Sequence, residues 1–274
     1  MRKSAIMFSV FILAGLFIAR CDVITFPITP ANNSTTPSHW TNQHKIMMAD
    51  SAGISDSVLI FYRESASYLA ERVLYNSGDS ASNPVHIPRE LTDLFYHGLL
   101  HISNANSIPA RDTIMQFVHV SPWPIRSIYN TIISVDSEAQ WLQRWFNGDT
   151  LTRNAAIDTL LRTYNLYPSE IHYFGESYDV YLHSESPINT TALAAKFAPL
   201  PDIQHANPEM FGGDGNDIGV GIDDSHLTYC FYIKWGDCFA GCINKRVWTF
   251  YVTYNGDVTF EGSSGDPINW DISE

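Results

Sequence analysis

Cys238 and Cys242 are the residue pair whose spacing is most informative about chemistry. Three residues separate them, and Gly236 and Gly241 allow the chain to turn sharply there. A thiolate zinc site needs four ligands, and this chain has no second close cysteine pair. A redox motif has two intervening residues instead of three. We therefore predict a disulfide that closes a hairpin end in an oxidising compartment, with Cys230 buried on a neighbouring strand.

An acidic, glycine-rich loop is the best candidate for a metal site. Asp214, Asn216 and Asp217 lie close together, and carboxylate and amide oxygens are the ligands that calcium prefers. The loop lacks the closing Glu of an EF-hand. A solvated, glycine-rich connecting loop is the expected role of this stretch, with a calcium site on these three residues as the alternative, and no other cofactor is expected.

Histidines are frequent, but their spacing is weakly informative. His97 and His101 have the i, i+4 spacing that can chelate a metal on a helix, although Gly98 replaces the Glu of a metalloprotease motif. Partly exposed helix histidines are the alternative. The remaining histidines of the folded region show no partner pattern: His86, His119, His172, His183, His205 and His226.

No motif assigns a catalytic residue. The run Gly262-Ser263-Ser264-Gly265 is one residue short of a nucleophile elbow. The run Gly213-Asp214-Gly215 lacks the third glycine of a dinucleotide-binding loop. The tryptophans could line a carbohydrate or peptide surface, or belong to the core. We expect a non-enzymatic protein, with a hydrolase as an alternative because a carboxylate pair leaves no local signature.

The N-terminus predicts export. Arg2 and Lys3 precede an apolar stretch that is too short to span a membrane, so residues 1–20 are predicted to be a signal peptide. The context of Cys21 resembles the lipobox of bacterial lipoproteins, which implies lipidation of Cys21, although Arg20 occupies a position where that family has a small residue. A lipoprotein and a secreted protein both remain open. The predicted location is extracytoplasmic in either case.

Composition restricts the partners. The net charge is −13, which excludes nucleic acid and leaves a membrane as a partner only through a lipid anchor. Another protein is the expected partner. Residues 21–44, rich in Pro, Ser, Thr and Asn, are predicted to be a flexible spacer.

The periodicity of the remaining chain predicts an α+β fold. Residues 45–125 should be a helical region, with one helix from Asp56 to Ser77 and a second from Pro88 to Asn104. Residues 126–209 have the order β-α-β-β-α-β of a ferredoxin-like unit, in which the first helix is broken at Asn147 and Gly148. Residues 210–274 are predicted to form an antiparallel β meander with the disulfide-clipped hairpin.

Two stretches resemble known families. The stretch from Tyr178 to Glu209 resembles propeptide and inhibitor domains of subtilisin-like proteases, which implies the ferredoxin-like fold and regulation of a serine peptidase as an alternative function. The run Trp235-Gly236-Asp237-Cys238-Phe239-Ala240-Gly241-Cys242, followed by Arg246, Trp248, Phe250 and Val252, resembles a C-terminal motif of secreted bacterial proteins. That second resemblance implies secretion and no activity.

Overall fold

The computed structural model describes residues 44–78 and 83–268. The predicted signal peptide, the predicted spacer except for its last residue, and Cys21 lie outside the described residues. The described chain is α+β, with two antiparallel four-stranded sheets, as predicted.

The N-terminal helices begin and end close to the predicted positions. Helix α2 covers Asp56–Asn76 and helix α3 covers Arg89–Asn104. A short helix α4, Pro109–Asp112, continues into a π-helical turn, Thr113–Phe117. Pro109 favours this start because its missing N–H falls where a helix has no internal acceptor for it.

The central unit has the predicted order of elements. Its sheet has the strand order β2-β3-β1-β4 with every neighbour antiparallel, which is the ferredoxin-like arrangement. The elements are β1 (Arg126–Asp136), α5 (Leu142–Phe146), α6 (Ala155–Thr163), β2 (Leu166–Phe174), β3 (Ser177–Ser184), α7 (Thr190–Phe197) and β4 (Ile203–Met210).

Strand β2 contains Pro168 near its start. A proline removes a ladder donor, and it is tolerated here since β2 is an edge strand with a register shift between Pro168 and Glu170. The predicted break at Gly148, which has a φ of +81°, separates α5 from α6.

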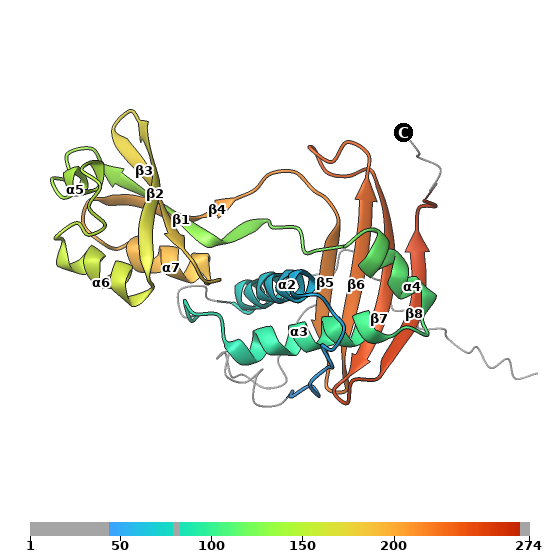
Figure 1. Ribbon diagram of the computed structural model, residues 1–274. Helices are drawn as coiled ribbons and strands as arrows, with labels where there is room; N and C mark the ends of the chain where they lie inside the picture. The colour runs from blue at the N-terminus through green and yellow to red at the C-terminus, as the bar shows by residue number, and fades with distance from the viewer. Residues whose placement is uncertain (1–43, 79–82, 269–274) are drawn as a thin grey trace, which may run out of the picture.

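The C-terminal region is the predicted meander. Its sheet has the order β5-β6-β7-β8, with strands at Asp217–Ile222, His226–Trp235, Asn244–Thr253 and Val258–Gly265. Figure 1 shows α2 and α3 lying across one face of this sheet, with the ferredoxin-like unit at the opposite end of the molecule. The helices and the meander therefore share one hydrophobic core, and the ferredoxin-like unit has its own.

Two consecutive residues of α2 attach this helix to both units. Glu71, which is 2% exposed, forms an ion pair with Arg126 at the start of β1, with 3.0 Å between Oε1 and Nε. Arg72 pairs with Asp217 at the start of β5 at 2.8 Å and donates to the Ile218 carbonyl. Such partly buried pairs are costly to break, because the remaining charge loses its partner.

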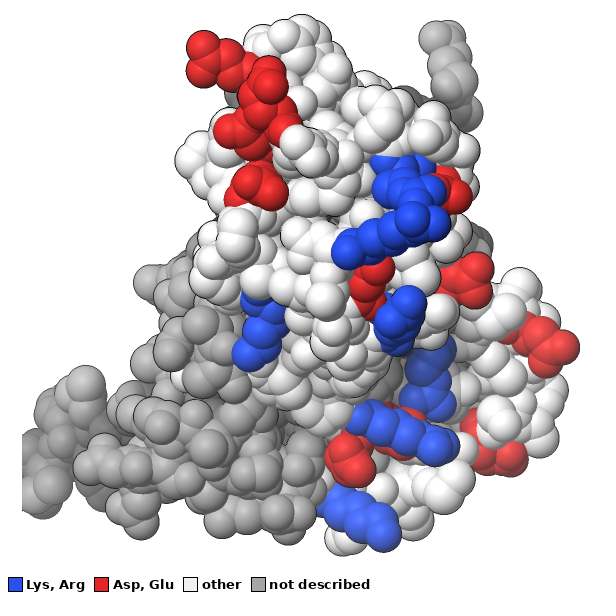
Figure 2. All heavy atoms as spheres, turned by 90° about the vertical axis from the view of Figure 1, so that its left-hand side faces the viewer, with Lys and Arg blue, Asp and Glu red and all other residues white. Residues whose placement is uncertain are grey.

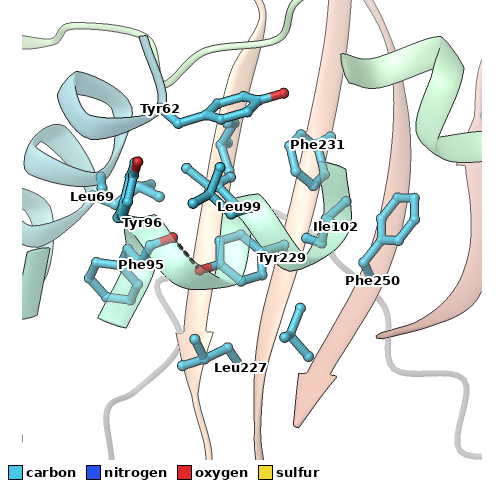
Figure 3. Packing of buried hydrophobic residues seen from close by; sticks show 14 of the residues in the cluster. Tyr62, Leu69, Phe95, Tyr96, Leu99, Ile102, Leu227, Tyr229, Phe231 and Phe250 are labelled. Atoms are coloured by element: carbon cyan, nitrogen blue, oxygen red, sulfur yellow. Dashed lines mark hydrogen bonds between the residues drawn. The ribbon is translucent and has the colours of Figure 1, made fainter. Parts of the chain in front are cut away.

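The shared core is tightest where α3 meets β6. Tyr229 is fully buried and its hydroxyl donates to the carbonyl of Phe95 at 3.0 Å, as Figure 3 shows. The ring packs against the helix at Gly98, where a Cβ atom would lie 2.8 Å from Cζ of Tyr229. Glycine is therefore required at this position by close approach and not by backbone conformation.

We expect Gly98→Ala to lower the free energy of unfolding by about 1–3 kcal/mol through overpacking. At an open helix position the same change would stabilise the protein by about 1 kcal/mol. Adding Tyr229→Phe removes the Tyr229 hydroxyl oxygen, which is the atom nearest to the new Cβ. The double variant should therefore lose less free energy of unfolding than the sum of the losses in the two single variants.

Denaturant unfolding of the four proteins measures this coupling. Gly212→Ala is the control, because a Cβ there meets nothing within 4 Å and its φ is not in the left-handed region. Strictly additive losses would contradict the proposed contact.

Candidate functional site

Two of the predicted calcium ligands contact Lys234 on β6, and the third contacts α2. Asp214 accepts a hydrogen bond from Lys234 at 2.6 Å and pairs with it, whereas Asn216 accepts one from the Lys234 amide at 3.0 Å. Asp217 pairs with Arg72 and accepts from the Trp123 amide. These donors hold the loop in place, and calcium binding stays a prediction.

The predicted disulfide between Cys238 and Cys242 is present. It closes the loop between β6 and β7, and Asp214 contacts both of its ends. The Asp214 amide donates to the Cys238 carbonyl at 2.8 Å, and the Cys242 amide donates to the Asp214 carboxylate at 3.4 Å. Cys230 is buried on β6, as expected.

His97 and His101 bind the chain segment that precedes α2. The Ala49 amide donates to Nδ1 of His97 at 3.3 Å, and Nε2 of His101 lies 2.8 Å from the Met47 carbonyl. Burial lowers the pKa of His97 and outweighs the Asp93 carboxylate, which by itself would raise this pKa. The two rings therefore attach residues 47–49 to α3.

The strongest concentration of unassigned polar groups lies on the ferredoxin-like sheet. Helices α6 and α7 pack on one face of this sheet. Because side chains alternate along a strand, the paired registers place twelve residues on the other face. We call this the open sheet face; it consists of Tyr167, Glu170, His172, Asp179, Tyr181, His183, Asn130, Ile132, Ser134, His205, Asn207 and Glu209.

The side chains of the open sheet face are ordered by contacts with one another. Asn130 connects two strands, because its Nδ2 donates to Glu209 at 2.8 Å while its Oδ1 lies 2.7 Å from Nδ1 of His183. A neutral His183 therefore carries its proton on Nδ1 and has Nε2 as its acceptor. The ring of Tyr167 lies 5.3 Å from that of His183.

Across the same face, a second row runs through His172, Asp179, Ser134 and His205. The Ser134 hydroxyl donates to the Asp179 carboxylate. His172 contacts the ring of Tyr181 edge-on at 5.6 Å. Burial and the nearby carboxylates raise the pKa of Tyr181, which keeps its hydroxyl a hydrogen-bond donor at neutral pH.

Helix α2 extends this polar region beyond the sheet. Burial and the nearby Glu64 carboxylate raise the pKa of Tyr129. Burial and the Glu64 carboxylate raise the pKa of Tyr68 to about 12, with further contributions from Tyr129 and Glu209. Both phenols are therefore neutral donors across the physiological range.

The arrangement on this face provides hydrogen bonding and aromatic contact. Within residues 44–78 and 83–268, no group of three or more His, Cys, Asp or Glu side chains is placed to hold a metal ion. The open sheet face was not predicted from the sequence, because His172, His183 and His205 lie far apart in the chain. The alternation of polar and apolar residues in β1 and β3 is the sequence feature that could have indicated a sheet with one polar face.

Comparisons with family models, with curated proteins and with solved structures found no match for this chain. Among the described helices, none has both the length and the apolar character that crossing a membrane requires.

The contacts of Asp214 make a prediction about acid stability. Burial would raise the pKa of Asp214, but hydrogen bonds from Lys234, Gly215 and Cys242 outweigh it and hold the pKa below its ordinary value. A carboxyl with a depressed pKa stabilises the fold above its unfolded pKa, and this stability is lost as the pH falls through the folded value. Asp214→Asn should therefore destabilise the protein at neutral pH, with the difference shrinking below about pH 4.

Thermal melts across pH measure this difference, with Asp224→Asn as a control from the same acidic stretch. A difference that stays constant into acid would contradict the assignment. Added calcium tests the metal prediction separately: a rise in Tm for the parent protein and not for Asp214→Asn supports a calcium site, and unchanged melting contradicts it.

Proposed function

We propose that this chain is an exported, non-enzymatic protein-binding module, secreted or lipid-anchored, that binds its partner through the open sheet face. The observation that carries the proposal is that α6 and α7 do not cover this face, and that hydrogen bonds between its own side chains nevertheless order it. Side chains that are ordered before binding lose less entropy in a complex. Tyrosines at the centre of such a surface are frequent energetic hot spots.

The chemistry of the face indicates the character of the partner. Glu170, Asp179 and Glu209 are the acidic groups of this face, and the whole chain has a net charge of −13. A basic protein surface complements these carboxylates, whereas a nucleic acid would be repelled. Export is supported by the predicted signal peptide and is compatible with the Cys238–Cys242 disulfide.

The test is a binding measurement with a matched pair of variants. Tyr181→Ser combined with His205→Ser alters the open sheet face. Tyr251→Ser combined with His226→Ser makes the same changes on the meander, where the two rings lie 4.7 Å apart. Envelope and secreted proteins of the native host are cross-linked to the mature chain, and the affinity of each recovered partner is then measured.

We expect the variant of the open sheet face to bind its partner at least about tenfold more weakly, equivalent to about 1.4 kcal/mol, with little change in the meander variant. Equal weakening in both variants, or the absence of any saturable partner for the parent protein, would count against the proposal.

A propeptide-like regulator of a serine peptidase is our second proposal, favoured by the strand order β2-β3-β1-β4 and by the resemblance of residues 178–209. Here β4 continues into the meander, and the Phe211 amide donates to the Ile125 carbonyl at 3.0 Å. Regulation would therefore use the sheet face and not a free tail after Glu209.

Titration of a subtilisin-like protease with the mature chain tests this second proposal. Inhibition by the parent protein that is lost in Tyr181→Ser with His205→Ser supports it. An unaffected protease at micromolar concentrations of the chain removes it.

A further inference from the structure

An open groove of about 510 Å³ lies between α5 and the start of α6. These helices belong to the side of the ferredoxin-like unit that packs against its sheet, opposite the open sheet face. The volume falls within the range of about 300–1,000 Å³ that small-molecule sites occupy.

Amide side chains supply most of the polar groups of the groove. Gln140, Gln143, Asn147 and Asn154 line it. The side chains of Gln140, Gln143 and Asn147 have no hydrogen bond to another described residue. Asn154 uses its Oδ1 to accept from the Ala156 and Ile157 amides at the start of α6, which leaves Nδ2 as a donor. Each of these amide groups can offer a donor to a ligand, and the amides of Gln140, Gln143 and Asn147 can also offer an acceptor.

One aromatic ring is held rigidly in the wall. The indole nitrogen of Trp141 donates to Asp202 at 2.9 Å. Its ring meets the buried ring of Trp145 at 88°, with 5.2 Å between the centroids. Trp141 remains half-buried, so part of its surface is available to a ligand.

Arg144 and Arg153 are the charged side chains that line the groove. Arg144 pairs with Asp149 at 2.8 Å, whereas the guanidinium of Arg153 has no ion pair with any described residue. No carboxylate of the described chain lines the groove. Figure 2, which looks onto this end of the molecule, shows Lys and Arg side chains along one side of the face with Asp and Glu side chains between them, and a separate acidic cluster at the top.

The backbone that carries Arg153 is fixed in an unfavourable conformation. Arg153 has a φ of +65°, which a non-glycine residue adopts only at a cost. The buried carboxylate of Asp158 holds it there by accepting from the Thr152 amide at 2.7 Å and from the Arg153 amide at 3.0 Å. Strained residues of this kind recur at ligand clamps.

We propose that this groove binds an acidic saccharide, a sugar that carries a carboxylate. Arg153 receives the carboxylate, because a guanidinium offers two parallel donors to it. Trp141 contacts the apolar face of the sugar ring, and the amides pair with its hydroxyls, each of which both donates and accepts. A peptide is disfavoured, since Trp141 is the only aromatic or aliphatic side chain among the residues that line the groove.

The experiment is calorimetric titration of the mature chain with an oligosaccharide of a hexuronic acid. The neutral oligosaccharide of the same linkage and an acidic peptide are the comparison ligands. Arg153→Gln removes the guanidinium charge and keeps the backbone amide that donates to the Asp158 carboxylate. Arg162→Gln is the matched control, because Arg162 lies on α6 outside the groove.

We expect saturable binding of the acidic oligosaccharide that Arg153→Gln weakens by roughly ten- to a hundredfold, as the loss of a charge-assisted hydrogen bond implies. The neutral oligosaccharide should bind more weakly by a similar factor, and Arg162→Gln should bind as the parent does. No saturable binding, equal binding of the acidic peptide, or equal weakening by the two arginine variants would overturn the proposal.

The groove and the open sheet face are tested independently. Tyr181→Ser with His205→Ser should leave the saccharide affinity unchanged, and a loss of saccharide binding in that variant would overturn the assignment to the groove.

Discussion

The N-terminal helices and the C-terminal sheet each have one apolar face, and each buries it against the other. Leu99 and Ile102 of α3 lie in the same core as Phe231 and Phe250 of the meander, although more than a hundred residues separate them in the chain (Figure 3). Burial of apolar area is the dominant favourable contribution to folding, so the chain must return from the ferredoxin-like unit to complete this core. The ferredoxin-like unit is therefore inserted between the two halves of this core.

The ferredoxin-like unit accommodates the return because its first and last strands are neighbours. Strands β1 and β4 are antiparallel, and Arg126 at the start of one is paired with Met210 at the end of the other. A unit whose ends lie together can be placed between two halves of another unit without disturbing either core. Glu71 and Arg72, adjacent on α2, then bind one unit each through Arg126 and Asp217. The same geometry leaves the sheet face opposite α6 and α7 open, so the candidate binding surface is a consequence of how the unit is held.

Much of the fold was predictable from local pattern, and the candidate sites were much less so. The helix positions followed from apolar spacing and from Pro88 and Ser77, and the disulfide followed from the spacing of its cysteines. The open sheet face depends on strand register, which brings His172, Asp179, Ser134 and His205 into one row. The groove depends on Asp158, whose carboxylate fixes the loop that carries Arg153. No short window of sequence contains either set of contacts.

The sequence by itself determined the α+β class, the order of the elements and the position of the hairpin that Cys238 and Cys242 close, because local periodicity and short spacings encode these features. Only the tertiary structure decided that the N-terminal helices and the meander share a core, and that His172, His183 and His205 lie on one sheet face. It also decided that the side-chain oxygens of Asp214, Asn216 and Asp217 accept hydrogen bonds from protein donors. The physical reason is that burial and pairing act between residues distant in the chain. Their partners are set by how whole faces pack and not by the residue types alone.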